Sequence, residues 1–132
     1  MTLSQQQGQL SAFVATWTED ATASGAIATA THVAEAGKSH YITGFSASSY
    51  DASAASGTST IQIKDDTDVI LTIYQDNGAS ASTTTTSGKG AGVTHSFTTP
   101  VLITAGNPCS IEITNSSATD LVAANLWGFT SL

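Results

Sequence analysis

The sequence predicts an all-β protein, an antiparallel β-sandwich of jelly-roll-like form that follows an extended N-terminal arm. Short runs in which apolar and polar residues alternate with a period of two recur along the chain, and turn-forming Gly, Pro, Asn and Asp residues separate them. No window shows sustained helical spacing, and Thr, Ser and Gly are too frequent for long helices. About eight short strands at spacings near ten residues are typical of a sandwich or jelly roll.

The chain divides into an arm, residues 1–20, and a single sandwich domain, residues 21–132. A chain of 132 residues can bury one hydrophobic core without help from disulfides. The beginning of the arm is polar, aperiodic and rich in Gln, and a short strand over residues 11–17 is an alternative for its second half. The arm residues that we expect to contact a partner are Gln5, Gln6, Gln7, Leu10, Phe13 and Trp17.

The first part of the sandwich contains two predicted strands. Gly25–Val33 alternates and is rich in β-branched residues, which favour strands. Glu35–Lys38 has the composition of a turn and precedes the second strand, His40–Ala47. Because Tyr41 and Ile42 are adjacent, the pattern leaves open which face of this strand points inward.

The segment Ile61–Tyr74 predicts an antiparallel hairpin with an acidic tip. Each of its two runs has apolar residues at a period of two, so one face of each can be buried. These residues are Ile61 and Ile63 in the first run, and Val69, Leu71 and Ile73 in the second. Because Ile70 makes the second run apolar on both parities, we expect that run to be covered on both sides, by the core and by a subunit contact.

The remaining elements are loops and further short strands. Residues 48–59 and 76–92 have the small, polar composition of loops, the second one long and of low complexity. The other expected elements are strands 93–98 and 101–104 around a Thr99-Pro100 break, a turn at 105–108, an alternating strand 109–114, and a last strand 121–129 with Val122, Ala124 and Leu126 on one parity and Trp127 and Phe129 on the other.

Composition argues against several kinds of partner. Charged residues make up 10% of the chain, against about 25% in an average soluble domain. There is no Arg, and three Lys face ten acidic residues, which gives a net charge of −7. Nucleic acids and anionic membranes are bound by clustered Lys and Arg, so neither is an expected partner. With neither a secretion signal nor a long apolar run in the sequence, we expect a soluble protein made in a cytoplasm.

Local motifs for catalysis or metal binding are weak. Ala36–Ser39 matches the end of a phosphate-binding loop, but His32 stands where that motif needs Gly, so we expect a turn. His32, His40 and His95 lack the close spacing of a helical metal-binding pair and have no apparent acidic partner, so no metal site is expected, although separate strands could bring them together. No Gly-x-Ser-x-Gly elbow is present. We expect no enzyme and no cofactor; a site assembled from distant strands is the remaining alternative.

Two further groups of residues have structural interpretations. Asp65, Asp66 and Asp68 could attract Ca²⁺, but the Gly and distal Glu of an EF-hand loop are missing, so a solvated hairpin tip is the prediction. Cys109, the only cysteine, shares its parity with the apolar positions of its strand. It is therefore predicted to be a small buried residue rather than a reactive thiol.

Several short motifs follow one another in order from residue 37 onward. They are Gly37–Gly44, Ile61–Asp66 with Val69–Leu71, Phe97–Val101, the Ala105-Gly106 turn and Ala124–Phe129. Their order resembles that of a group of small bacteriophage virion proteins with a β-sandwich fold. In such proteins these segments are core strands and turns, so the resemblance implies a structural role on a virion and no catalytic site. The loop Ala79–Gly92 and the Gln-rich start have no counterpart in that pattern.

The resemblance implies a non-enzymatic virion protein made in the host cytoplasm, most simply a capsid decoration or cement protein. The arm is then expected to dock on the head, against the major capsid protein or another virion protein, while loops 48–59 and 76–92 project outward. Because few Lys residues guard the strand edges, we also expect a homo-oligomer, a trimer.

The alternative is a tail or fibre-tip module that binds host glycans through loop hydroxyls and Trp127 or Trp17. Trp17, Trp127 and Phe129 could stack on a sugar. Aromatic residues near the ends of a small sandwich are more often core or subunit-contact residues, which favours the first interpretation.

Overall fold

A computed structural model describes residues 15–25, 27–51, 57–76, 89–115 and 121–131. They form eight strands: β1 (Trp17–Ser24), β2 (Ile27–His32), β3 (Ser39–Asp51), β4 (Thr58–Asp65), β5 (Asp68–Asp76), β6 (Lys89–Leu102), β7 (Cys109–Asn115) and β8 (Leu121–Ser131). No helical segment with the length and apolarity needed to cross a membrane occurs among the described residues.

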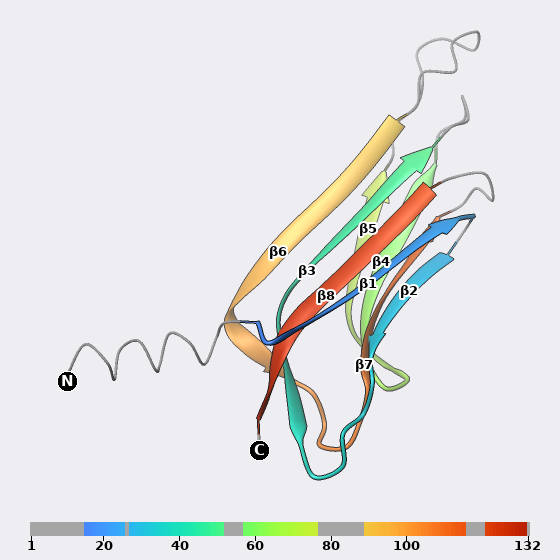
Figure 1. Cartoon of the computed structure of the whole chain (residues 1–132). Helices are drawn as coiled ribbons and strands as arrows, with labels where there is room; N and C mark the ends of the chain where they lie inside the picture. Colours follow the sequence, from blue (N-terminus) through green and yellow to red (C-terminus); the bar gives the residue numbers. More distant parts are fainter. Residues whose placement is uncertain (1–14, 26, 52–56, 77–88, 116–120, 132) are drawn as a thin grey trace, which may run out of the picture.

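Two four-stranded antiparallel sheets lie face to face (Figure 1). One sheet, called the β1 sheet here, has the order β1-β8-β3-β6, and the other, the β2 sheet, has the order β2-β7-β4-β5. Strands that follow each other along the chain mostly alternate between the sheets, which is the strand order of a jelly roll. The predicted antiparallel β-sandwich is confirmed.

The boundary between arm and sandwich differs from the expected one. Because β1 begins at Trp17 and pairs with β8, residues 17–20 belong to the β1 sheet rather than to the arm. The predicted partner contacts Gln5, Gln6, Gln7, Leu10 and Phe13 lie outside the described residues, and so does any strand before residue 15.

The core lies between the sheets and depends on few large side chains. In β7 every second residue is buried, as the alternation predicted, and Cys109 is among the buried residues. The largest fully buried apolar side chains are Ile42, Phe45, Ile61, Ile63, Ile103, Ile111, Ile113 and Leu126. Burying each of these stabilises the fold by about 1.5–3 kcal/mol. Val122, Ala124 and Leu126, which share one parity in β8, are buried in the core.

A β-bulge in β3 answers the question of which face points inward. Along β8 the pairing passes from Ile42–Gly128 to Gly44–Trp127, so Thr43 is an extra residue of β3 opposite β8. Both Ile42 and Phe45 are therefore buried although they have opposite parity. Tyr41 lies on the outer face, where its ring stacks on Phe129 with centroids 4.8 Å apart.

A second bulge changes the predicted face of β5. Ile63 pairs with Leu71 and Lys64 with Val69, so Ile70 is the extra residue. Leu71 and Ile73 pack against the core, as expected. Val69 does not: it is 46% exposed, and Ile70 is 44% exposed. The prediction that Val69 shares the buried face was wrong because the bulge reverses the parity at that point.

β6 runs through two places where the sequence predicted no strand. Gly90 and Gly92, expected in the loop, pair with Tyr50 and Ser48 of β3. The expected break at Thr99-Pro100 appears as a gap in pairing. Gly44 of β3 pairs with Ser96 of β6, and Ile42 of β3 pairs with Val101 of β6, so the register skips residues 97–100. Proline has no N–H to donate, and its position on an edge strand tolerates this loss.

Candidate functional site

Two histidines meet where the chain crosses from one sheet to the other. His32 is the last residue of β2, and His40 is the second residue of β3. Their rings lie 4.4 Å apart between centroids, at 79° to each other. His95 lies elsewhere, exposed on β6 with its ring 4.9 Å from that of Phe97. The structure therefore brings together two of the three histidines considered from the sequence.

The turn between these strands brings an acidic residue to the pair. Lys38 N donates to the Glu35 carbonyl oxygen at 3.2 Å, and Gly37 has φ +72°, as a type II turn requires at its third position. The segment is thus the predicted turn into a strand. Lys38 Nζ donates to Glu35 Oε2 at 2.7 Å, while Glu35 Oε1 lies 3.9 Å from His32 Nε2.

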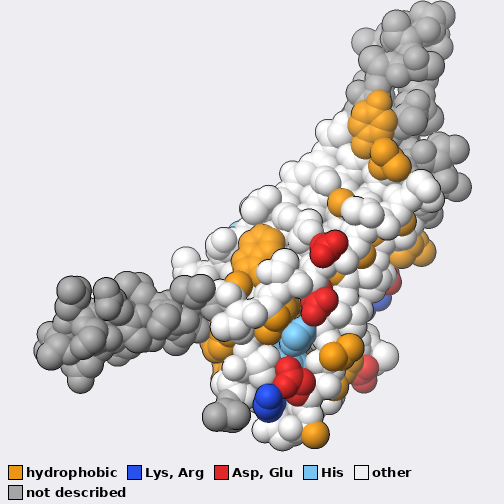
Figure 2. Space-filling model, viewed as in Figure 1, with side chains coloured by type: hydrophobic (Ala, Val, Ile, Leu, Met, Phe, Trp, Pro, Cys, Tyr) orange, Lys and Arg blue, Asp and Glu red, His pale blue; other side chains and the backbone are white. Residues whose placement is uncertain are grey.

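His32, Glu35 and His40 form a compact set of potential metal ligands, called the His-Glu-His cluster here. One ligand atom from each residue lies within 4.8 Å of the other two. Across the described part of the chain, no other trio of His, Cys, Asp or Glu comes as close. Figure 2 shows histidine, acidic and lysine side chains gathered toward one end of the molecule.

Two side chains of β1 hold the His32 ring in place. The Trp17 indole stacks on it, with centroids 4.1 Å apart and planes at 8°. Glu19 Oε1 lies 2.8 Å from His32 Nδ1. A carboxylate can only accept, so Nδ1–H donates, and in the neutral ring Nε2 then carries the free lone pair. The His32 side chain is only 12% exposed, and within the described part of the chain its buried Nε2 has no hydrogen-bond partner.

His40 is held in a neutral state. Its Nε2 lies 3.0 Å from the Val33 carbonyl oxygen, to which it donates, and its Nδ1 lies 2.8 Å from Thr130 Oγ1. Burial lowers the pKa of His40 below its usual 6.5, and the nearby His32 ring lowers it further. The His40 ring is therefore in the neutral form in which imidazole binds metals.

Glu35 supplies the negative charge of the cluster. The hydrogen bond from Lys38 lowers the pKa of Glu35 below its usual 4.5, so the group is a carboxylate at neutral pH. It stands on the turn, where its side chain is about one-third exposed. The cluster thus combines two fixed rings with a carboxylate on a more accessible segment.

The acidic hairpin tip is organised differently from the prediction. Asp65 turns back toward the turn before β7: its Oδ2 accepts from Thr104 N at 2.9 Å and Thr104 Oγ1 at 2.7 Å, and its Oδ1 accepts from Asn107 Nδ2 at 2.8 Å. Asp66 and Asp68 are exposed, as a solvated tip requires. In the described residues these three carboxylates do not form a metal-ligand group.

The aromatic residues proposed as a sugar platform do not share one face. Trp17 packs against the core, near Gly128. Trp127 lies over Gly44 on the outer face of the β1 sheet, and Phe129 stacks there on Tyr41. A three-residue platform is therefore not formed, and Trp17 has packing partners within its own chain.

A shallow groove of about 350 Å³ lies on the outer face of the β1 sheet. Hydroxyl groups and two larger side chains surround small residues of β1, β3 and β8. Its lining includes Thr22, Ser24, Ser48, Tyr50, Leu121 and Ala123.

Sequence reasoning missed the two glutamates of the histidine site. Glu35 lies between His32 and His40 in the spacing His-x2-Glu-x4-His, which was a usable signal. A helical spacing was the wrong test, because a strand end, a turn and the next strand start also bring side chains together. Glu19 comes from another strand, and no local pattern indicates its position.

No known protein family matches the sequence, and no curated protein is significantly similar to it. Among solved structures, the chain is similar to dimeric latent PorU from Porphyromonas gingivalis, with a TM-score of 0.50 and 13% identity over 89% of this chain and 13% of that one. It also matches the enzymatically active domain of bacteriophage CBA120 tailspike protein 4, with a TM-score of 0.33 and 12% identity over 83% of this chain and 14% of that one. The chain thus spans a small part of either structure, and the likeness to PorU shows the fold alone.

Proposed function

We propose that this chain is a non-enzymatic structural protein of a bacteriophage virion, a capsid decoration protein that associates with itself as a trimer and binds the major capsid protein or another virion protein. The ordered sequence motifs support the virion assignment. The jelly-roll strand order is compatible with it, since viral capsid domains use this architecture. The exposed apolar edge of the β2 sheet is the observation that carries the structural role.

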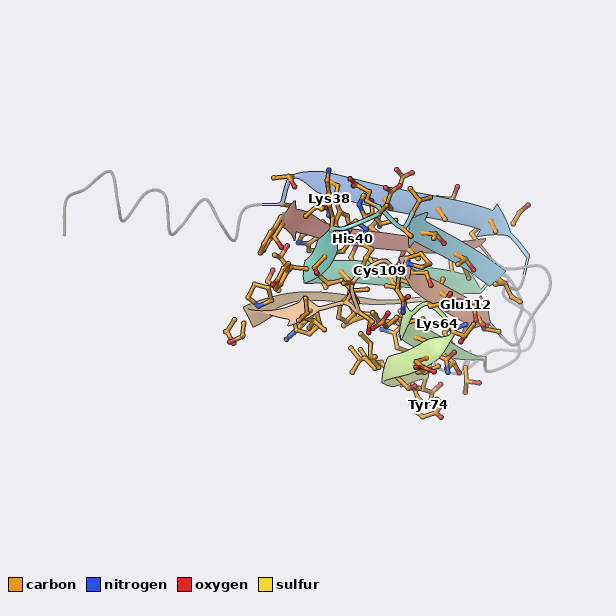
Figure 3. The ribbon with its side chains drawn as sticks, turned by 90° about the horizontal axis from the view of Figure 1, so that it is seen from below. Lys38, His40, Lys64, Tyr74, Cys109 and Glu112 are labelled. Atoms are coloured by element: carbon orange, nitrogen blue, oxygen red, sulfur yellow. The ribbon has the colours of Figure 1, made fainter. Side chains whose placement is uncertain are left out.

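That edge is strand β5, which among the described strands has a hydrogen-bonded neighbour on one side only. Val69 and Ile70 are about half-exposed, and Tyr74 is 80% exposed. Figure 3 shows Tyr74 pointing outward from the side opposite Lys38 and His40. Lys64, on the adjacent strand β4, is paired with Glu112 at 3.2 Å between Nζ and Oε1. An edge strand that exposes large apolar side chains favours association with another protein surface.

Quantitative mass spectrometry of gradient-purified virions tests the proposal. A decoration protein is expected in numbers comparable to the major capsid protein, with labelled peptides of both as internal standards. A tail or fibre-tip protein would be present in far fewer copies. Absence of the chain from the purified particle would overturn the virion assignment.

The role of the arm has its own test. Removing residues 2–12 is expected to abolish binding to particles that lack the protein, while the sandwich stays folded because β1 begins only at Trp17. Circular dichroism and thermal melting check the folded state of the shortened chain. Full binding by the shortened chain would contradict docking through the arm.

The groove beside Tyr50 favours a second candidate, a glycan-binding module at a tail tip. Its hydroxyl groups and one aromatic ring are the groups with which proteins bind sugars. Glycan-array binding that Tyr50→Ala removes would support this candidate over decoration. No binding by the wild-type domain to any glycan would count against it.

A further inference from the structure

We propose that the His-Glu-His cluster binds a divalent transition metal, Zn²⁺ in the first place, through one nitrogen each of His32 and His40 and a carboxylate oxygen of Glu35. This inference concerns a different part of the molecule from the β5 edge and does not depend on the virion assignment. Two imidazoles and one carboxylate form a donor set that suits Zn²⁺, with other divalent transition metals as competitors.

The unpartnered atom is the first support. His32 Nε2 is buried, has no hydrogen-bond partner among the described residues and lies 3.9 Å from Glu35 Oε1. Buried polar side-chain atoms are nearly always hydrogen-bonded, so the lone pair of this nitrogen stands out as a potential ligand for a cation.

The second support is the tautomer of His32. Glu19 accepts the proton of Nδ1 at 2.8 Å and so leaves Nε2 as the metal-binding nitrogen. A carboxylate that holds the far nitrogen of a ligating histidine is the usual outer partner in zinc sites, where it fixes the ring and increases its basicity.

The geometry requires a modest contraction. Zinc–ligand distances near 2.1 Å place neighbouring ligand atoms of a tetrahedral site about 3.4 Å apart. The present atoms lie within 4.8 Å of one another. Glu35 stands on an accessible turn and can close the difference, while His40 exchanges one of its two hydrogen bonds, to Thr130 or Val33, for the metal. Three protein ligands leave a further position for water.

The positive charge of Lys38 disfavours cation binding at the cluster, so a substitution of Lys38 provides a distinctive test. Its Nζ is held by Glu35 Oε2 at 2.7 Å, close to the place that the cation would occupy. Replacing it with a neutral residue removes a positive charge and releases the second carboxylate oxygen. Lys38→Gln should therefore strengthen Zn²⁺ binding, whereas a merely structural Lys38–Glu35 pair predicts no effect on binding.

The experiment is calorimetric titration of Zn²⁺ into the full chain, without a histidine tag, at pH 7.5. One Zn²⁺ per chain is expected. Glu35→Gln and His32→Ala should each weaken binding by roughly 100-fold or more, because even outer partners of metal ligands contribute about 10- to 100-fold. Glu19→Gln, which changes an outer partner of His32, should weaken Zn²⁺ binding by about 10- to 100-fold. His95→Ala is the matched control and should bind as the wild type does.

Two further outcomes decide the proposal. Co²⁺ in place of Zn²⁺ should give the intense visible absorption of a four-coordinate nitrogen and oxygen site, and Glu35→Gln should remove it. If the wild type binds no Zn²⁺, or if Glu35→Gln and His95→Ala both bind as the wild type does, the proposal is overturned. Glu35→Gln decides the matter even where His32→Ala fails to fold, because Glu35 lies on the turn outside the core.

Discussion

Cys109 is a thiol in a place that keeps it protonated. It is fully buried at the start of β7, and burial, helped by the negative charges of Asp65 and Glu19, raises its pKa to about 12. At pH 8 the thiolate fraction is then about one in ten thousand, and only the thiolate is reactive. We expect native protein to react with a chromogenic disulfide reagent far more slowly than free cysteine, as followed by absorbance.

The control for Cys109 is the same protein in denaturant, which should react at once and with one equivalent of reagent. Rapid labelling of the native chain at pH 8 would mean that β7 opens readily or that the thiol is accessible. Either result would contradict the packing of Cys109 between the sheets.

Asp65 makes stability depend on pH in the acidic range. Burial acts to raise its pKa, but hydrogen bonds from Thr104 Oγ1, Thr104 N and Asn107 together hold the pKa below the usual 3.8. A carboxyl group with a lowered pKa in the folded state stabilises the fold fully above pH 3.8, and this contribution is lost as pH falls through the lowered value. We expect Asp65→Asn to cost about 1–2 kcal/mol at pH 7.

Urea unfolding measured at pH 7 and at pH 2 to 3 checks this prediction. The difference between wild type and Asp65→Asn should shrink at the lower pH, since the wild-type carboxyl group then also becomes neutral. Asp66→Asn is the matched control: Asp66 is exposed, and Asn tolerates its positive φ of 54°. Equal losses from the two substitutions would contradict the special role of Asp65.

At the scale of single elements, strand identity could be predicted from the sequence, but the face of a strand beyond a bulge could not. The alternation in β7 gave the correct buried residues because β7 pairs with both β2 and β4 without a shift. In β5 the extra residue Ile70 moved Val69 to the exposed side. A bulge depends on pairing with a distant strand, so a local pattern does not reveal it.

The same limit applied to the candidate site. His32 and His40 are eight positions apart and lie on different sheets, so only the crossing turn brings them together. The turn itself could be predicted from Gly37, and with it the position of Glu35. Glu19 reaches His32 through packing between β1 and β2, a tertiary contact that no spacing in the sequence indicates.

At Gly128, β8 lies in close contact with β3 and with a side chain of β1. A Cβ at this position of β8 would overlap the Tyr41 carbonyl oxygen and lie 2.5 Å from the nearest atom of the Trp17 ring. Backbone cannot move aside easily, so Gly128→Ala should destabilise the protein by about 3 kcal/mol or more, at the upper end of overpacking effects. Chemical denaturation gives the free energy of unfolding directly.

Gly92→Ala provides the comparison for Gly128. A Cβ at Gly92 would meet its nearest neighbours at 3.6 Å, an ordinary contact distance. We expect a change within about 0.5 kcal/mol for this substitution on the edge strand β6. A loss at Gly92 as large as that at Gly128 would show that strand glycines are needed here for reasons other than close contact.

At the scale of the whole molecule, the two long sides of the sandwich differ. On one side, β1 and β2 lie next to each other, and contacts between Trp17, Glu19 and His32 connect the sheets. On the other side, the edge strand β5 exposes Val69, Ile70 and Tyr74. The first side is closed by its own side chains, so the second is where a further copy of the chain is expected to bind.

Ile70→Lys tests this placement of the subunit contact. A lysine on an edge strand blocks strand-to-strand association and is costly to bury in an apolar interface. We expect the dissociation constant of the oligomer to rise roughly 100-fold, about 2.7 kcal/mol. The monomer's free energy of unfolding should change by less than about 1 kcal/mol, because Ile70 is a half-exposed bulge residue.

Sedimentation velocity over a range of concentrations measures the association, with Ile27→Lys as control. Ile27 is also an exposed apolar residue on an edge strand, but it lies in β2, on the closed side. The oligomer should dissociate with Ile70→Lys and persist with Ile27→Lys, because only the first substitution places a charge at the β5 edge. The reverse pattern would move the contact to the β2 side, and a monomeric wild type would remove the basis for a trimer.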